Sequence, residues 1–170
     1  MVREIVVQPY DPSVRDFFER EKILLLSGLG TGCEVHHIGS TSVPGLGGLN
    51  IIDMLLIVPM RSSADLAAQT LKSLGYARDD THGDKERIFF RCNRVYGEKK
   101  VQVELHVMWR SSSAYKDYLL FRDYLREHPG EAARYFTLKQ QWLRVGKREA
   151  YSAKKAEYIR RVLEKAVRRA

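Results

Sequence analysis

Apolar residues follow two different spacings in the first part of the chain. After Asp11-Pro12-Ser13, a sequence typical of a helix start, they recur at helical spacing as far as Leu26, and a cluster of glycines then predicts the helix end. Glu34–Ile38 and the run Ile51–Val58 instead have the length and composition of strands. The second run is apolar throughout except for Asp53, which is typical of a buried strand.

The rest of the chain predicts one helix, two strands and then only helices. Ala64–Leu74 is predicted as a helix, and Arg87–Cys92 and Val101–Val107 as strands joined by a hairpin-like segment. Three helices are predicted after them, over residues 115–128, 131–145 and 150–170. Short antiparallel strands followed by helices indicate an α+β fold, with a mixed sheet flanked by helices. We expect a single domain over residues 1–170, with an αβ core in 1–110 and a helical subdomain in 111–170.

The composition is that of a folded domain. The 170 residues are 44% hydrophobic and 29% charged, which excludes collagen-like and disordered chains. No apolar run approaches the ~18 residues of a membrane span, and the first residues lack the apolar core of a signal peptide. Two cysteines, Cys33 and Cys92, are too few to suggest a disulfide framework or a zinc ribbon. We therefore expect a cytoplasmic protein with reduced thiols and no membrane partner; the oligomeric state is not predicted.

The net charge of +8 is placed unevenly. Residues 1–130 hold 17 basic and 17 acidic side chains, whereas residues 131–170 hold 12 and 4. A basic end of this kind attracts phosphate, on a nucleotide, a nucleic acid or a lipid surface. The alternative is the solvated face of a terminal helix.

A glycine-serine turn and a buried acid are the first candidate for chemistry. Gly39-Ser40 follows a predicted strand, so backbone N–H groups and the serine hydroxyl can approach a phosphate. Asp53 interrupts an apolar strand, where a charge must be paired, hydrated or bound to a cation. The structural alternative is an Asp53 that faces solvent on an edge strand or caps a backbone amide.

A second polar face follows from strict alternation in Val101–Val107. Gln102, Glu104 and His106 share one face of this predicted strand. Glu104 and Asp53 could jointly hold magnesium, which prefers oxygen ligands and retains waters. An ordinary half-exposed strand explains the segment equally well. If the site exists, Ser40, Asp53 and at least one of Glu104 and His106 should converge on one pocket.

These motifs resemble a known family. The segment from His37 to Leu46, followed by Ile51-Ile52-Asp53, resembles the signature of the GrpB family, and weaker matches extend the resemblance over about residues 5–165. The resemblance implies a nucleotidyltransferase-like fold. Members of the wider superfamily carry Gly-Ser, then Asp-hydrophobic-Asp, then a third acid. Here Leu55 stands at the second acid, so the resemblance leaves catalysis open: two-metal phosphoryl chemistry uses several carboxylates.

Basic residues in the predicted helices are candidates for phosphate contacts. Tyr135 and Lys139 share one helix face, as do Tyr151 and Lys155, because each pair is four residues apart. Such a pair either stacks on a base and binds its phosphate, or places the tyrosine in the core while the lysine reaches outward. Arg122 lies mid-helix among apolar residues, so we expect it to be partly covered and paired with an acid or an anionic ligand.

The preferred function is binding of a nucleotide or related phosphorylated metabolite, with magnesium-dependent nucleotidyl transfer as the candidate reaction. Asp53 and Glu104 are predicted to hold the cation, and His106 to accept a proton. The predicted phosphate contacts are Gly39, Ser40, Thr41, Ser42, Arg122, Lys139 and Lys155. The alternatives are a catalytically inactive nucleotide-binding module and an RNA-associated protein that uses its basic C-terminal helices.

Overall fold

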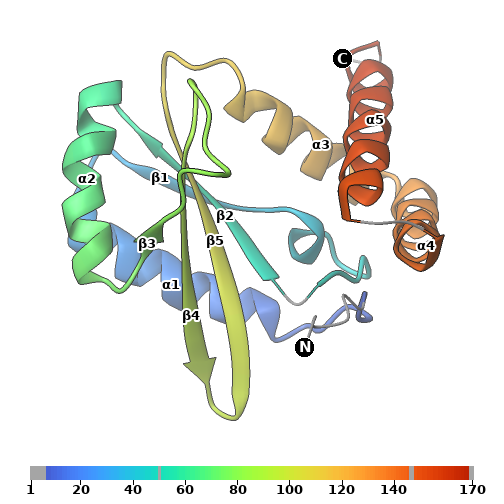
Figure 1. Cartoon of the computed structure of the whole chain (residues 1–170), viewed down its shortest axis with the longest axis horizontal. Coiled ribbons are helices and arrows are strands. Elements are labelled where there is room, and N and C mark those ends of the chain that lie inside the picture. The colour runs from blue at the N-terminus through green and yellow to red at the C-terminus, as the bar shows by residue number, and fades with distance from the viewer. Residues whose placement is uncertain (1–6, 50, 146–147, 169–170) are drawn as a thin grey trace.

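A mixed sheet lies between two layers of helices (Figure 1). The computed structural model describes residues 7–49, 51–145 and 148–168. Within that part of the chain, five strands form one sheet in the order β1-β2-β5-β4-β3. β2 and β5 run parallel, and the other neighbouring strands are antiparallel. This arrangement confirms the predicted α+β class.

The element bounds follow the hydrophobic pattern closely. The strands are β1 (Glu34–Ile38), β2 (Ile51–Val58), β3 (Ala77–Arg78), β4 (Ile88–Tyr96) and β5 (Lys99–Trp109). The α-helices are α1 (Val14–Leu29), α2 (Arg61–Ser73), α3 (Tyr115–Glu127), α4 (Pro129–Val145) and α5 (Arg148–Val167), and a 3₁₀ turn covers Ser40–Ser42. None of the helices described here is both long and apolar enough to cross a bilayer.

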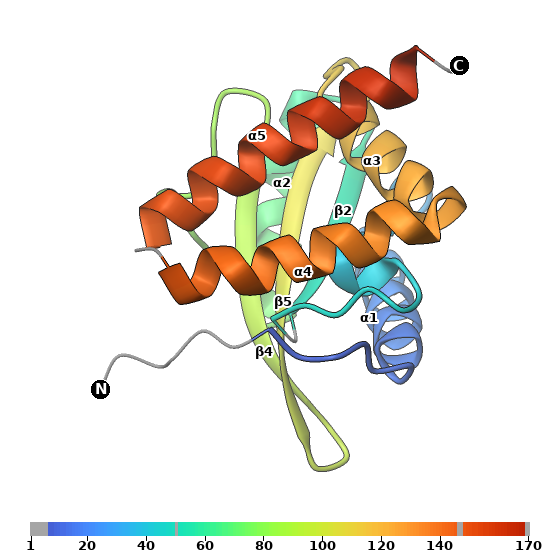
Figure 2. The same cartoon turned by 90° about the vertical axis from the view of Figure 1, so that its right-hand side faces the viewer.

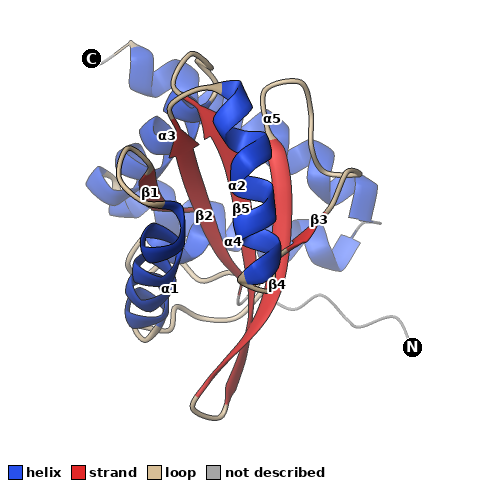
Figure 3. Ribbon diagram, turned by 90° about the vertical axis from the view of Figure 1, so that its left-hand side faces the viewer, coloured by secondary structure: helices blue, strands red, loops and turns tan. Residues whose placement is uncertain are grey.

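One face of the sheet packs on α1 and α2 (Figure 3). Alternate residues of β2 and β5 point into this core, among them Met54, Leu56, Val103 and Leu105, all fully buried. Because side chains alternate across a strand, the residues between them point to the opposite face. Asp53 and Glu104 therefore lie on the face away from α1 and α2.

The opposite face is covered by α3, α4 and α5 (Figure 2). Leu55 and Ile57 of β2 pack there beneath Tyr118 of α3. Tyr135 of α4 and Val162 of α5 join the second cluster of this layer, together with apolar residues of the loop before β2. The C-terminal helices thus form a wall beside the polar residues of β2 and β5.

Three local predictions need correction. The hairpin-like segment after Cys92 is part of the sheet, because Gly97 adopts φ 61° and allows a tight turn directly between β4 and β5. The helix predicted from residue 131 begins two residues earlier, at Pro129, because the first position of a helix tolerates the missing N–H of proline. β3 has only two residues, too few for an alternating pattern.

Candidate functional site

The turn after β1 places Gly39 against Asp53. Antiparallel pairing sets Ile38 opposite Asp53 at the start of β2. Gly39 then takes φ 71°, a conformation that favours glycine, and a Cβ added to it would lie 2.2 Å from Asp53 Oδ2. The chain turns into Ser40–Ser42 immediately afterwards. Glycine at 39 therefore serves both the backbone turn and the close approach of the carboxylate.

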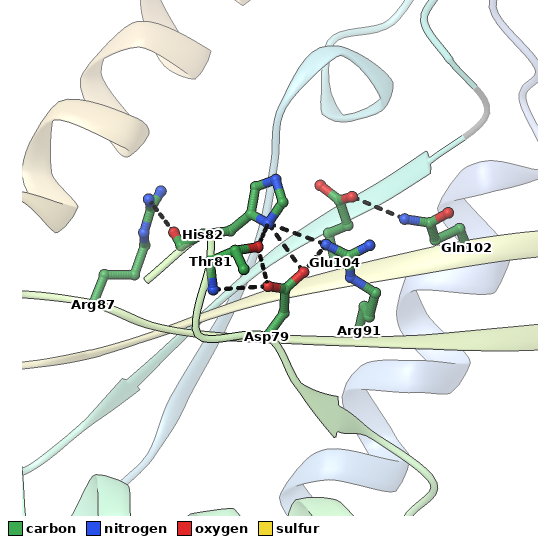
Figure 4. Close-up of polar contacts among 7 residues, drawn as sticks. All are labelled: Asp79, Thr81, His82, Arg87, Arg91, Gln102 and Glu104. Atoms are coloured by element: carbon green, nitrogen blue, oxygen red, sulfur yellow. Dashed lines mark hydrogen bonds and ion pairs between the residues drawn. The ribbon is translucent and has the colours of Figure 1, made fainter. Parts of the chain in front are cut away.

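Asp53 and Glu104 are neighbours across two parallel strands. They occupy matched positions in the pairing of β2 with β5, so both project from the same face. Burial raises the pKa of Glu104, and the nearby charge of Asp53 raises it further. The amide of Gln102 donates a hydrogen bond of 2.9 Å to Glu104 Oε1 (Figure 4). The structure thus sets two carboxylates close enough for their charges to interact.

His106 contacts Asp53 with one ring nitrogen and Arg87 with the other. Nε2 lies 3.8 Å from Asp53 Oδ1, and Nδ1 lies 3.3 Å from Arg87 Nη1. Burial lowers the pKa of His106, so the ring is neutral near pH 7. A guanidinium can only donate, so Nδ1 accepts and Nε2 carries the proton toward Asp53. This arrangement argues against the predicted role of His106 as a proton acceptor, because no acceptor nitrogen is left free.

Lys139 of α4 reaches the glycine-serine turn from the helical side. Its side chain is only 2% exposed, and Nζ donates to Ser40 Oγ at 2.8 Å and to the Gly47 carbonyl at 2.7 Å. Burial lowers its pKa to about 7, with a further contribution from Lys155, against the attraction of Asp53. A third donor position of an ammonium at Nζ stays available to a ligand.

A cleft of about 550 Å³ lies between the sheet and α5, and Gly39 and His106 are not among the residues that line it. Six of the residues predicted for the site line it: Ser40, Thr41, Asp53, Glu104, Lys139 and Lys155. The ring of Tyr151 and the side chain of Ile159 add an apolar part to the wall. Ser40, Asp53 and Glu104 therefore converge on one concave site, as the sequence predicts; their chemical roles stay predictions.

Two predicted phosphate contacts are used elsewhere. Ser42 Oγ donates to the Gly39 carbonyl at 2.6 Å, and the residue is 4% exposed, so it stabilises the turn. Arg122 pairs with Asp123 at 2.7 Å and donates to the His37 carbonyl at 3.2 Å. The expectation of a covered, paired Arg122 is confirmed, but neither it nor Ser42 lines the cleft.

Three residues of the site were not predicted. His82, in the loop between β3 and β4, and Arg87 line the cleft. Arg91 of β4 lies opposite Glu104 of β5 in the strand register. The Nε atoms of Arg87 and Arg91 are buried without a hydrogen-bond partner. The alternation of side chains along β4 could have revealed Arg91. Phe90 packs in the core, so the next residue, Arg91, must face the cleft side.

Metal ligands are sparse in the described residues. No group of three or more His, Cys, Asp or Glu side chains is arranged there to hold an ion. A cation in the cleft would take Asp53 and Glu104 from the protein and its other ligands from water or a bound phosphate.

Comparison with solved structures defines the class of fold. Cid1 in complex with its short product ApU superposes with a TM-score of 0.53 at 12% identity, covering 78% of this chain and 42% of Cid1. A cytoplasmic RNA terminal U-transferase superposes with a TM-score of 0.51 at 14% identity, covering 75% of this chain and 39% of that protein. This likeness shows a nucleotidyltransferase-type fold, and at such identities it shows the fold alone.

The chain belongs to the GrpB family, whose model, described as GrpB protein, matches residues 4–165. The crystal structure of the conserved protein GrpB from Enterococcus faecalis has a TM-score of 0.82 at 31% identity, covering 96% of this chain and 98% of that one. A UPF0157 protein of Pseudomonas aeruginosa is 34% identical over 96% of this chain and 68% of its own length. The UPF0157 protein YqkA of Bacillus subtilis is 33% identical over 82% of this chain, which spans only 40% of YqkA.

Proposed function

We propose that the cleft binds the phosphate groups of a nucleotide or related phosphorylated metabolite and supports magnesium-dependent nucleotidyl transfer. The observation that carries this proposal is the pair of carboxylates, Asp53 and Glu104, facing a glycine-serine turn and two lysines in one cleft. The nucleotidyltransferase-type fold is consistent with this class of function but does not identify a ligand.

Phosphate recognition rests on the serine and the two lysines that line the cleft together with the acids. Lys139 already binds Ser40, so a phosphate oxygen placed beside both gains a hydroxyl donor and a buried positive charge. Lys155 is exposed on α5 and lines the same cleft, so it can neutralise a second phosphate. A cleft lined by both acids and lysines favours a ligand that carries phosphate and a cation together.

The donor set fits a single magnesium ion. Asp53 and Glu104 supply the oxygen ligands that magnesium prefers. Burial and then the charge of Asp53 raise the pKa of Glu104, and a shared cation would offset both effects. When bound, the ion supplies positive charge that stabilises phosphoryl oxygens. His106 then acts as a positioning residue, because its Nε2–H faces Asp53 and Arg87 holds its other nitrogen.

A binding module without catalysis is the second candidate, and Leu55 favours it. Leu55 is fully buried beneath α3 with Ile38 and Met108. It therefore contributes no carboxylate where the superfamily pattern has a second acid. A cleft with one cation still binds a nucleotide, but it lacks the pair of ions about 3.5–4 Å apart that two-metal transfer uses.

A thermal-shift panel tests these two functions. Wild type, Asp53→Asn and Asp65→Asn are melted with each nucleoside triphosphate, with and without magnesium. Asp65 is an exposed acid of α2, on the other side of the sheet, and serves as the matched control. We expect a magnesium-dependent rise in melting temperature for wild type and Asp65→Asn that is lost in Asp53→Asn. A magnesium-independent rise favours the binding module, and no rise with any compound contradicts both.

RNA is the alternative partner for the basic helices. Arg134 of α4, Lys154 of α5 and Arg168, which directly follows α5, are exposed, so a phosphate backbone can approach them. Affinity for single-stranded RNA, measured by fluorescence anisotropy, should then fall steeply with salt. Absence of binding at low salt, or binding that salt does not weaken, contradicts this electrostatic interaction.

A further inference from the structure

The loop between β3 and β4 holds His82 at the cleft wall through contacts on both sides (Figure 4). Asp79 Oδ1 accepts hydrogen bonds from the backbone N–H of Thr81 at 2.9 Å and from its hydroxyl at 2.5 Å. Arg91 donates to Asp79 Oδ2, and Arg87 donates to the His82 carbonyl at 2.7 Å. Arg91 of β4 and Arg87, the residue before β4, therefore hold the loop around His82 in place.

The contacts of the His82 ring determine its tautomer. Nδ1 lies 3.0 Å from Asp79 Oδ2 and 2.8 Å from Thr81 Oγ1. The carboxylate can only accept, and the hydroxyl hydrogen of Thr81 is already donated to Asp79, so both oxygens accept from Nδ1–H. Arg91 Nη2 also lies 3.3 Å from Nδ1, but Asp79, which can only accept, is the nearer partner at 3.0 Å, so Nδ1 carries the hydrogen. Nε2 is therefore left as an acceptor, and Figure 4 shows it turned away from Asp79, on the side of Glu104.

His82 in the cleft wall and His106 beside Asp53 thus have opposite tautomers. His106 presents N–H to Asp53 and uses its acceptor nitrogen on Arg87. His82 presents a free acceptor nitrogen and is held by a carboxylate on its far side. A histidine ring oriented by a carboxylate is the arrangement that general bases use, because the carboxylate fixes the tautomer and stabilises the imidazolium that forms.

We propose that His82, oriented by Asp79, accepts the proton of the hydroxyl group that attacks the nucleotide. This assignment rests on the proposed function. The hydroxyl oxygen of an alcohol or of water forms a bond to the α-phosphorus of a nucleoside triphosphate. The bond from that phosphorus to pyrophosphate breaks, and its electron pair leaves on the pyrophosphate. The hydroxyl proton passes to Nε2 of His82.

The surroundings of His82 suit this role. Asp79 faces Nδ1 and fixes the orientation of the ring, and Glu104 lies within range of its charge. Arg91 is the opposing cation, and it is paired with Asp79. Phe89 packs against the ring at 5.5 Å between centroids. The ring is half-exposed, so a substrate hydroxyl can reach it.

The test uses water as the attacking hydroxyl, so it needs no knowledge of the natural acceptor. Pyrophosphate release from the nucleoside triphosphate that gives the largest thermal shift is measured with magnesium from about pH 5 to 8, the range in which histidine titrates. His82→Gln is compared with Asp79→Asn and with His36→Gln. His36 pairs with Glu34 at 3.4 Å but does not line the cleft, which makes it the matched control.

We expect His82→Gln to lose about 100-fold or more in rate and to lose the rise of rate with pH, with unchanged nucleotide affinity. Asp79→Asn should lose less, and His36→Gln should match wild type. Nitrogen-15 chemical shifts give a readout without turnover: His82 should show an unprotonated Nε2 in wild type, and Asp79→Asn should lose this preference. A rate and pH profile in His82→Gln equal to wild type, or a protonated Nε2 in the neutral ring, overturns the assignment.

Failure of the proposed function gives a different result. Wild type that binds no nucleotide in the thermal-shift panel contradicts the nucleotide site itself. Wild type that binds a nucleotide but releases no pyrophosphate overturns the role of His82 and the transfer reaction together, and leaves the binding module.

Discussion

Nζ of Lys139 lies 2.8 Å from Oγ of Ser40, and the lysine is almost completely buried. Helical spacing places Lys139 on the same face as Tyr135, and the tyrosine is in the core as the sequence favours. The lysine does not reach outward, because Ser40 and the Gly47 carbonyl give it partners inside. The cleft wall thus holds a buried amine that loses its charge just above neutral pH.

Replacing Lys139 with Met should change how stability depends on pH. The pKa of Lys139 is lowered from 10.5 to about 7, so between these values the unfolded chain binds more protons and stability rises with pH. This gain in the free energy of unfolding is absent below about pH 7. Wild type should gain roughly 2 kcal/mol relative to Lys139→Met between about pH 7 and 9 in urea unfolding. Exposed Lys100→Met is the control, and parallel curves for all three proteins contradict the low pKa.

Replacing Gly39 with Ala should cost more than replacing Gly45. Both glycines have positive φ, 71° and 80°, a strained backbone conformation that costs an alanine about 1–3 kcal/mol. A Cβ at Gly45 meets nothing within 4 Å, whereas one at Gly39 meets the Asp53 side chain. Displacing that side chain adds about 1–3 kcal/mol, by analogy with overpacking. Denaturant unfolding measures both costs, and Gly39→Ala should also abolish the ligand-induced thermal shift. Equal costs for the two variants contradict the close approach.

The sequence predicts the elements that depend on local pattern. β1 and β2 have the predicted bounds, because each is an uninterrupted strand-like run next to a glycine-rich segment. The meeting of Asp53 with Glu104 was also predictable, since alternation puts Glu104 on a polar face and Asp53 stands out in an apolar strand.

Features that depend on distant contacts could not be predicted. The tautomer of His106 depends on Arg87, and the burial of Lys139 depends on a carbonyl 92 residues earlier in the chain. His82 is in a loop without periodicity, so its place in the cleft comes from the short strand β3 and from Arg87. The family motif does not predict these contacts, because a motif specifies residue types along the chain and not the partners of each side chain in the fold.

Lys155→Met and Lys154→Met should separate the cleft from the surface beside it. The two lysines are adjacent and exposed on α5, but only Lys155 lines the cleft, while Lys154 lines the outer groove between α4 and α5. Lys155→Met should weaken nucleotide affinity about 3- to 10-fold, the loss expected of one exposed charge contact of about 1 kcal/mol. Isothermal titration calorimetry at two salt concentrations checks this. A loss in Lys154→Met as large as in Lys155→Met places the ligand elsewhere.

Glu21→Gln should destabilise the protein without affecting the cleft. Glu21 is 2% exposed on α1 and accepts hydrogen bonds from Arg94, Tyr76 and Tyr96 on the far side of the sheet. Burial alone would raise its pKa, but these hydrogen bonds outweigh burial and lower the pKa, so its contribution to stability is lost as pH falls. The neutral amide leaves Arg94 without its charged partner, which costs about 3–5 kcal/mol. Urea unfolding should show this loss near neutral pH and a smaller difference from wild type in acid, whereas exposed Glu19→Gln should match wild type at both. Nucleotide affinity should be unchanged in folded Glu21→Gln, because Glu21 and its partners lie on the face of the sheet opposite the cleft. A weakened affinity would mean that the two faces are coupled through β4.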